Sequence, residues 1–310
     1  MRPSPTRVRL GLLAALTALT ALVSMGTASA ATELSGNWAP FTRCPVDAPA
    51  MLAADGKIDT ALCLSSHSAA GSIKLGSSVV PTGASDLQLG VVTHPGGTST
   101  LISPPGGALI ADSAQLPGGL LGLMCPSDIP VVSSICKQIT NVSLNRVTAT
   151  IESVNSPSDF KLIAGTTTGQ QIIALPVRIH LENTFLGSNC YIGSTSNPIV
   201  LRPQNLTKPT IATQRFDADG TPNTAGVATR LALIGADQSD STYAVPGASG
   251  CGLGLLDWAV NLKTSLPSAA GNNNVVLNSA STYLGGVNGP AAVAPNDGAL
   301  LSQYWHTAAQ

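Results

Sequence analysis

Alternating apolar and polar positions make residues 171–182 the clearest strand in this chain. A β-strand turns successive side chains to opposite faces, so the alternation predicts one buried face and one wet face. Pro176 lies within the run and lacks the N–H that a sheet ladder uses, which predicts an edge strand or a bulge at that point. The apolar positions that recur at every second residue are Ile173, Leu175, Val177, Ile179 and Leu181.

Other short runs rich in Val, Ile, Thr and Ser are bounded by Gly and Pro, which predicts further strands joined by turns. Asp219-Gly220 predicts a hairpin turn after the run at 211–216. This spacing predicts a mostly β fold, either an antiparallel β-sandwich or a barrel-like architecture, with one or two short helices. The remaining runs cover residues 72–75, 87–93, 108–111, 146–153, 160–164, 199–202, 226–234 and 274–284.

Two segments have the apolar spacing of helices rather than strands. Residues 254–266 predict a helix that Pro267 ends, and residues 128–140 predict a second helix that Ser127 can cap. We expect the apolar stripe of each helix to face the protein interior. The stripes consist of Leu255, Ala259, Leu262 and Leu266 in the first segment, and of Val132, Ile135, Cys136 and Ile139 in the second.

The first 30 residues have the three-part pattern of a signal peptide. Arginines without any acidic residue precede an uncharged apolar stretch over residues 10–23, which is shorter than the roughly 20 residues that span a membrane. Ala28-Ser29-Ala30 then places small residues where a signal peptidase reads them. We therefore expect cleavage after Ala30 and secretion of a mature chain that comprises residues 31–310.

Composition and charge narrow the function classes of the mature chain. The full chain has 15 Lys and Arg against 16 Asp and Glu, and the expected signal peptide contains only basic charges, so its removal leaves an acidic protein. This balance excludes the clustered positive charge on which nucleic-acid binding depends. The length of residues 31–310 fits one compact unit, with a subdivision near residues 140–146 as an alternative.

Six cysteines in an exported chain indicate disulfide bonds. A zinc site is the alternative, but no Cys-x-x-Cys occurs and the four histidines are scattered singly. Six cysteines allow many connectivities, of which the simplest joins neighbours in the sequence. These pairs would be Cys44–Cys63, Cys125–Cys136 and Cys190–Cys251.

No catalytic, cofactor-binding or metal-binding residue can be assigned from a motif. The turn-like segment 247–250 contains Ser249 but lacks the Gly-x-Ser-x-Gly spacing of a hydrolase nucleophile. Arg178, His180 and Glu182 share one face of their strand, either as an acid–base cluster or as a solvated surface. The segment 217–220 resembles the start of a calcium loop, but the Glu expected at its twelfth position is Ala228.

The segment 116–136 is loop-like, almost free of charge, and rich in Leu, Ile and Val. It predicts either a buried connector or an exposed apolar patch that contacts lipid, cell wall or another partner. A Cys125–Cys136 ring would hold the segment in place at low entropic cost, as a binding surface requires. The candidate contact residues are Leu120, Leu121, Leu123 and Met124.

Several strings in the chain resemble a family of secreted actinobacterial proteins of uncharacterised function. The resemblance covers the whole mature chain and implies export, but it brings no catalytic residue with it. The strings are Gly36-Asn37-Trp38, Phe41-Thr42-Arg43-Cys44-Pro45-Val46-Asp47, and the segments 119–126, 186–193, 245–252 and 266–268.

Three functions are consistent with these observations. The first is an exported, non-catalytic protein of the cell surface or extracellular matrix that uses no cofactor. The second is a carrier or binder of an apolar small molecule or lipid, and the third is an extracellular hydrolase. A deep apolar pocket would favour the carrier, a cleft with a carboxylate pair or a Ser–His pair would favour the hydrolase, and a packed sandwich with neither would favour the surface role.

Overall fold

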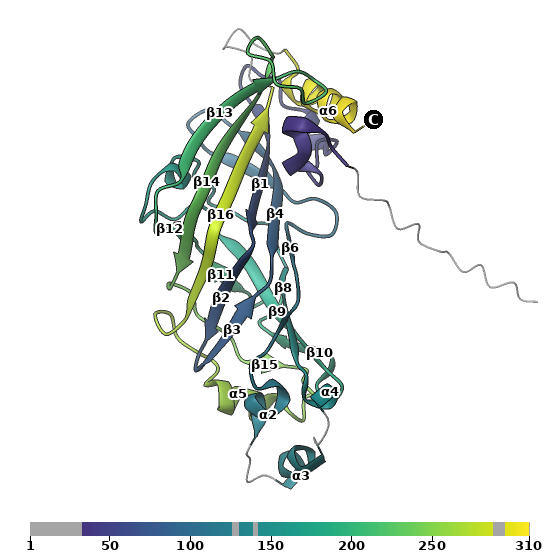
Figure 1. The fold of residues 1–310 in the computed structure, drawn as a ribbon, viewed down its shortest axis with the longest axis vertical. Helices are drawn as coiled ribbons and strands as arrows, with labels where there is room; N and C mark the ends of the chain where they lie inside the picture. The colour runs from purple at the N-terminus through teal and green to yellow at the C-terminus, as the bar shows by residue number, and fades with distance from the viewer. Residues whose placement is uncertain (1–32, 126–129, 139–141, 288–294, 310) are drawn as a thin grey trace, which may run out of the picture. The chain divides into compact units, whose positions relative to one another are not determined.

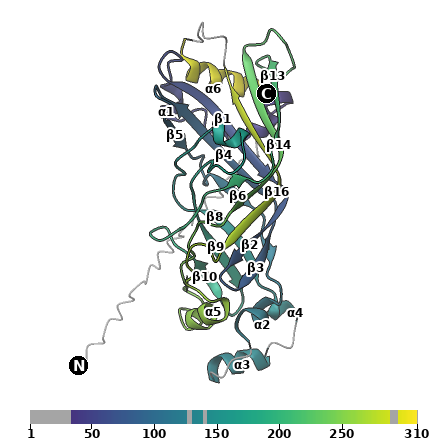
Figure 2. The same cartoon turned by 90° about the vertical axis from the view of Figure 1, so that its left-hand side faces the viewer.

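Two antiparallel sheets form the framework of the protein in a computed structural model, which describes residues 33–125, 130–138, 142–287 and 295–309. The arrangement is sandwich-like and not a closed barrel, which confirms the expected mostly β fold (Figures 1 and 2). Contacts group Thr32–Gln310 into one compact unit. Residues 1–32, 140 and 141 lie outside the described part, so the signal peptide and a subdivision near 140–146 stay predictions.

Ten strands build the larger sheet, which we call sheet A. They are β1 (Thr60–Ser68), β2 (Ala70–Leu75), β3 (Ser78–Thr82), β4 (Ser85–Thr93), β5 (Ser99–Ile102), β6 (Leu109–Ala111), β12 (Gln204–Asn205), β13 (Thr210–Phe216), β14 (Ala228–Asp240) and β16 (Asn274–Gly286). The main order is β12-β14-β16-β1-β4-β5, while β13 pairs with β14, β2 with β16 and β3, and β6 with β4.

Bends in two long strands shape sheet A. β14 and β16 each span 13 residues, and each changes its outer partner halfway along its length. Their shared register shifts between Leu233 and Gln238, where Gly235 has a φ of 79° and the Asp237 carboxylate accepts the Ser279 N–H at 2.9 Å. Such bulges bend a strand and increase its twist.

Six strands build the smaller sheet, sheet B. They are β7 (Ala114–Gln115), β8 (Thr148–Ser153), β9 (Leu175–Asn183), β10 (Gly187–Ile192), β11 (Ile199–Leu201) and β15 (Ala248–Ser249). Their order is β15-β10-β9-β8-β7, and β11 also pairs with β9. The two sheets meet where the Leu109 N–H of β6 donates to the Ser153 Oγ of β8 at 3.2 Å.

β9 is the strand that the alternating pattern predicted, and its expected buried face is confirmed. Val177, Ile179 and Leu181 are at most 1% exposed. The edge position or bulge expected at Pro176 is wrong, because β9 lies between β8 on one side and β10 and β11 on the other. Pro176 is tolerated since β8 ends at Ser153, so its missing N–H falls beyond the end of the β8 ladder.

The strand expected at residues 160–164 is also wrong. This segment leads into a single turn of 3-10 helix, η2 (Ile163–Thr166), in which the Thr166 Oγ1 donates to the Ile163 carbonyl at 2.8 Å. Ile163 is 76% exposed, so the apolar character of the run does not reflect burial on a sheet. Phe160 lines two of the cavities described below, Leu162 lines one of them, and Ala164 is buried at 1% exposure.

Short helices lie at the two ends of the sheets (Figures 1 and 2). The expected helices occur as α3 (Pro130–Gln138) and α5 (Asp257–Thr264), each shorter than the apolar spacing suggested. The Ser127 cap and Ile139 lie outside the described residues. The others are η1 (Gly36–Phe41), α1 (Pro49–Leu52), α2 (Gly119–Met124), α4 (Val142–Asn145) and α6 (Asp297–Ala308).

Only half of the stripe expected to bury the α5 segment is buried. Ala259 and Leu266 are 4% and 7% exposed, as expected, whereas Leu255 and Leu262 are 71% and 76% exposed. The neighbouring Leu256 and Val260 are buried in their place. The rotation of α5 follows from its start, because the Asp257 carboxylate accepts the Cys251 N–H at 2.7 Å. That bond ties the first turn of the helix to the segment beside the Cys190–Cys251 bond.

Three disulfide bonds join the cysteine pairs that are neighbours in the sequence: Cys44–Cys63, Cys125–Cys136 and Cys190–Cys251. Such bonds indicate an oxidising environment. Among the helices in the described part of the chain, none has both the length and the apolar character to cross a membrane.

Candidate apolar ligand site

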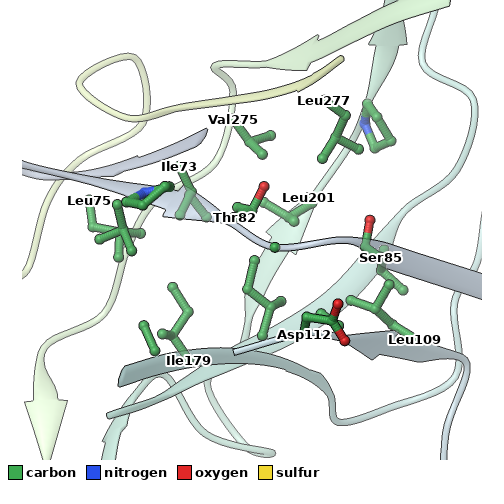
Figure 3. Close-up of a pocket in the computed structure, with 18 residues that line it drawn as sticks. Ile73, Leu75, Thr82, Ser85, Leu109, Asp112, Ile179, Leu201, Val275 and Leu277 are labelled. Atoms are coloured by element: carbon green, nitrogen blue, oxygen red, sulfur yellow. The ribbon is translucent and has the colours of Figure 1, made fainter. Parts of the chain in front are cut away.

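An apolar cavity lies between the two sheets. Sheet A lines it from β2, β3, β4, β6 and β16, and sheet B lines it from β8, β9 and β11 (Figure 3). The space open to the centre of a water-sized sphere is about 70 Å³, whereas a single water needs about 10–15 Å³ by the same measure. The apolar lining residues are Ile73, Leu75, Val80, Pro81, Leu109, Ala111, Ala149, Ile151, Leu175, Ile179, Leu201, Pro203, Val275 and Leu277.

Two further cavities continue this space along the inner face of β16. The second measures about 80 Å³ and the third about 20 Å³. Leu109, Leu175 and Leu277 line both the first and the second, and Ala280 and Thr282 line both the second and the third. The lining residues of the three cavities therefore follow β16 from Val275 to Leu284, an elongated path that suits a slender chain better than a compact ring system.

Small side chains and the bulged strands keep this space open. Ala149 of β8 and Ala280 of β16 face it where larger side chains would fill it. Gln238 and Ala280 flank the register shift between β14 and β16 and line the second and third cavities. We therefore attribute the open space to two features: the bending of the strands, and the small side chains of Ala149 and Ala280 in its walls.

The few polar side chains of the first cavity gather where β3 turns into β4. Thr82 ends β3, Ser85 begins β4, and Asp112 follows β6 at the same corner (Figure 3). The Asp112 N–H donates to the Ala84 carbonyl at 2.8 Å, which fixes its backbone beside the turn. Since Asp112 is exposed and still lines the cavity, we take this corner as its mouth.

Charge is almost absent from the site. Asp112 is the single Asp, Glu, Lys, Arg or His among the described residues that line the three cavities. General acid–base catalysis needs a donor or acceptor within hydrogen-bond reach of the reacting group, usually with a partner that sets its pKa. The lining can therefore surround an apolar molecule, but it assembles no acid–base pair.

The acid–base cluster expected on β9 lies on the outer face of sheet B, away from this lining. The Arg178 guanidinium pairs with the Glu152 carboxylate at 2.8 Å and lies 4.0 Å from the centre of the Tyr191 ring. His180 stacks on the same ring at 4.5 Å, and its Nε2 lies 3.0 Å from the Ser188 carbonyl. With its side chain only 13% exposed, His180 is covered by its neighbours rather than solvated.

Ser249 and His180 do not form a nucleophile–base pair. Both are cross-strand neighbours of Tyr191, one on each side, so two strand spacings of about 4.8 Å separate them. A base must approach its nucleophile to about 3 Å. In the turn at 217–220, the Asp217 carboxylate binds within its own loop. Both of its oxygens accept from the Asn223 side-chain amide at 2.9 Å.

Other titratable groups with shifted pKa values lie away from the cavities. A hydrogen bond from the Ser302 hydroxyl, followed by contacts with His306, lowers the pKa of Asp47. Burial raises the pKa of Tyr243, whose hydroxyl donates to the Lys74 carbonyl at 3.1 Å. Neither Asp47 nor Tyr243 lines any of the three cavities.

The candidate contact surface at Leu120, Leu121, Leu123 and Met124 requires a correction. Leu120 and Leu123 are buried at 0% and 3% exposure in the core between the sheets, and Leu121 is half-buried. The side chain of Met124 lies outside the described residues. Two glycines begin α2 at this point and turn one face of its leucines inward, so a Gly- and Pro-rich composition did not prevent a helix.

An exposed apolar surface occurs elsewhere, around α5, and the sequence analysis missed it. We call Leu253, Leu255, Trp258 and Leu262 the α5 patch; their exposed fractions are 95%, 71%, 38% and 76%. The Trp258 Nε1–H donates to the Leu255 carbonyl at 3.0 Å, which holds the indole on this surface. The sequence does contain a signal for this surface. The α5 segment has a second apolar stripe, shifted by one residue from the stripe that we expected to be buried.

The cavity was not predicted either, since its walls come from positions scattered between Ile73 and Leu277. No family model matches the chain, and neither a curated protein nor a solved structure shows significant similarity to it. Function is therefore inferred from the residues that line the space between the sheets.

Proposed function

We propose that this protein is an exported carrier that holds an apolar molecule with a slender chain, such as a lipid tail, between its two sheets. The series of apolar cavities along β16 is the observation that supports this function. Ligand sites in proteins are typically concave, mostly apolar, and furnished with a few polar groups that orient the ligand. The corner at Thr82, Ser85 and Asp112 supplies such groups.

A void of this kind is costly unless something fills it. Protein interiors are packed about as densely as organic crystals, and holes larger than a water molecule are few. Each cubic ångström of empty core costs roughly 24 cal/mol in mutational series. A bound apolar chain would recover these contacts, so a carrier role gives the open space a physical reason that a purely structural role does not.

Export rests on the signal-peptide pattern of residues 1–30 and on the disulfide bonds, which persist in oxidising compartments. A ligand-free role at the cell surface is the second candidate. The observation that favours it is the α5 patch, because exposed apolar surfaces of soluble proteins often mark contacts with membranes or partners.

Two adjacent residues on β6 provide a matched test. Leu109 lines the first two cavities, whereas its neighbour Ile110 is 51% exposed and points away from them. A fluorescent monoacylglycerol probe, which has an acyl chain and no charge, should bind the wild-type protein and the Ile110→Trp variant with similar Kd, because Ile110 does not line the three cavities. Leu109→Trp should weaken binding at least tenfold, since the indole occupies the space of the chain.

Thermal unfolding of both variants provides the control for folding. Saturating acyl probe should raise the Tm of the wild type and of Ile110→Trp, since a ligand that binds only the folded state stabilises it. Equal probe binding by both variants, or no binding by a folded wild-type protein, would overturn the carrier function. Mass spectrometry of molecules that copurify with the secreted protein would then identify the native chain.

A further inference from the structure

We propose that the mouth of the first cavity selects a single-chain amphiphile whose head group donates hydrogen bonds and carries no negative charge, such as a long-chain alcohol, monoacylglycerol or amine. The inference rests on the proposed carrier function and adds the class of head group to it. Three observations support it: an unpartnered hydroxyl in the lining, an unpaired carboxylate at the mouth, and the lack of any cation between them.

Thr82 carries the unpartnered hydroxyl. Its Oγ1 is buried and has no hydrogen-bond partner among the residues that the structure describes, although the residue lines the cavity. A buried polar atom without a partner is destabilising, and native proteins leave few of them. The oxygen itself is covered, so a ligand head with a hydroxyl or amino group would satisfy it once the Thr82 side chain rotates toward the cavity.

Asp112 carries the unpaired carboxylate. Within the described part of the chain, no Lys, Arg or His forms an ion pair with it, and it is the single charged side chain in the lining of the cavity. Its backbone is fixed by the bond to the Ala84 carbonyl, and its Cβ would meet a Cβ placed on Gly83 at 2.8 Å. The carboxylate therefore stays beside the turn that separates Thr82 from Ser85.

These positions discriminate between head groups of the same chain length. A fatty-acid carboxylate at the mouth would face Asp112 without any cation to neutralise either group, and like charges close together repel. A hydroxyl or ammonium head would instead donate to the Asp112 carboxylate and could also bond to the Thr82 hydroxyl. Charge-assisted bonds of this kind are roughly twice as strong as neutral ones.

The test compares dodecanol, dodecylamine and dodecanoate as competitors of the bound acyl probe, with dodecanol below its solubility limit and the other two below their micelle concentrations. We expect dodecanoate to bind the wild-type protein at least about tenfold more weakly than dodecanol, a difference of about 1.4 kcal/mol. Asp112→Asn should bring the two within about threefold of each other by removing the repulsion. Glu33→Gln is the matched control, because Glu33 is exposed and lines none of the cavities, and it should leave the ratio unchanged.

Thr82→Val tests the hydroxyl with a side chain of nearly the same shape. Its Tm should equal or exceed that of the wild type, because the unsatisfied polar atom is gone. Dodecanol binding should nevertheless fall by about two- to tenfold, the range of one hydrogen bond. If the three dodecyl compounds bind equally in wild type and Asp112→Asn, the head-group inference fails while the carrier function stands; if none binds, the carrier function itself fails.

Discussion

Two interior regions of this protein are built from different side chains and filled to different degrees. At one end of sheet A, Trp38 packs edge-on against Phe41 and Phe216, with ring centres 6.1 Å and 5.1 Å away. All three side chains are 0% exposed. Between the sheets, by contrast, aliphatic residues and alanines surround open space, and Phe160 is the one aromatic residue in the lining of the three cavities.

Under the proposed carrier function, the difference separates the region that stabilises the fold from the region that holds the ligand. Aromatic side chains bury large areas and prefer defined ring geometries, and the indoles here also donate hydrogen bonds. Trp38 Nε1 donates to the Ala218 carbonyl at 3.1 Å and Trp305 Nε1 to the Phe41 carbonyl at 2.8 Å. Leucine, isoleucine and valine make no directional bonds, so a wall built from them leaves a bound chain free to slide along it.

The largest expected effect contrasts the two regions directly. Trp38→Ala should lower the free energy of unfolding by about 3–5 kcal/mol, because it removes a fully buried indole and its ring contacts. Leu277→Ala should cost less than about 2 kcal/mol, since Leu277 is half-buried and already borders two cavities. Urea denaturation measures both; equal losses would refute the contrast between a packed and an open interior.

A smaller effect concerns pH at the aromatic end, where α6 begins with Asp297. Burial raises the pKa of Asp297 to about 6, against the lowering effect of the Ala61 N–H that donates to its carboxylate at 2.6 Å. The folded state therefore favours the protonated acid, and the stability it gains from this group below about pH 4 is lost as the pH rises through 6. A shift of about two units corresponds to up to about 3 kcal/mol.

Asp297→Asn isolates this group from the other carboxylates. The Tm of the variant should rise relative to wild type as the pH increases from 4 to 7, because Asn cannot ionise and its amide oxygen can still accept the Ala61 N–H. A constant difference in Tm between the two proteins over this range would show that Asp297 does not control the pH dependence.

The smallest effect on stability belongs to the α5 patch, which neither interior region includes. Replacing Leu253 and Leu262 together by Ser should change the free energy of unfolding by less than about 0.5 kcal/mol per residue, since both side chains are exposed. Leu256→Ser, one position from the patch and 3% exposed, is the destabilising counterpart. Sedimentation with lipid vesicles measures the second candidate function: unchanged vesicle binding by the double variant would exclude the α5 patch as a contact surface.

Local patterns in the sequence predicted the elements that depend on local physics. The alternation from Ile173 to Leu181 specified both a strand and its buried face. The edge or bulge predicted from Pro176 was wrong, because a sequence does not reveal where the neighbouring strand ends, which here is at Ser153. Helical spacing around Leu255 and Leu262 was ambiguous, because two adjacent stripes are apolar and the bond between Asp257 and Cys251 selects one of them.

Local sequence patterns could not predict the candidate site, for a different reason. Ile73 and Val275 are 202 positions apart in the chain, and both carry the apolar character that a packed core would also require. Whether buried aliphatic residues touch or enclose a space depends on the bends of β14 and β16, which follow from pairing between distant strands. The polar corner at Thr82 and Asp112 is recognisable only once those strands are in place.

The aromatic core joins segments that are far apart in the chain, because Trp38 and Phe41 share it with Trp305. η1 and α6 lie together at one end of sheet A (Figure 1), and the Ser35 N–H donates to the Ala308 carbonyl across nearly the whole chain. Because synthesis delivers the N-terminus first, Trp38 and Phe41 complete their packing only after Trp305 has been made. The aromatic core is therefore a contact between segments far apart in the chain, and its completion depends on α6.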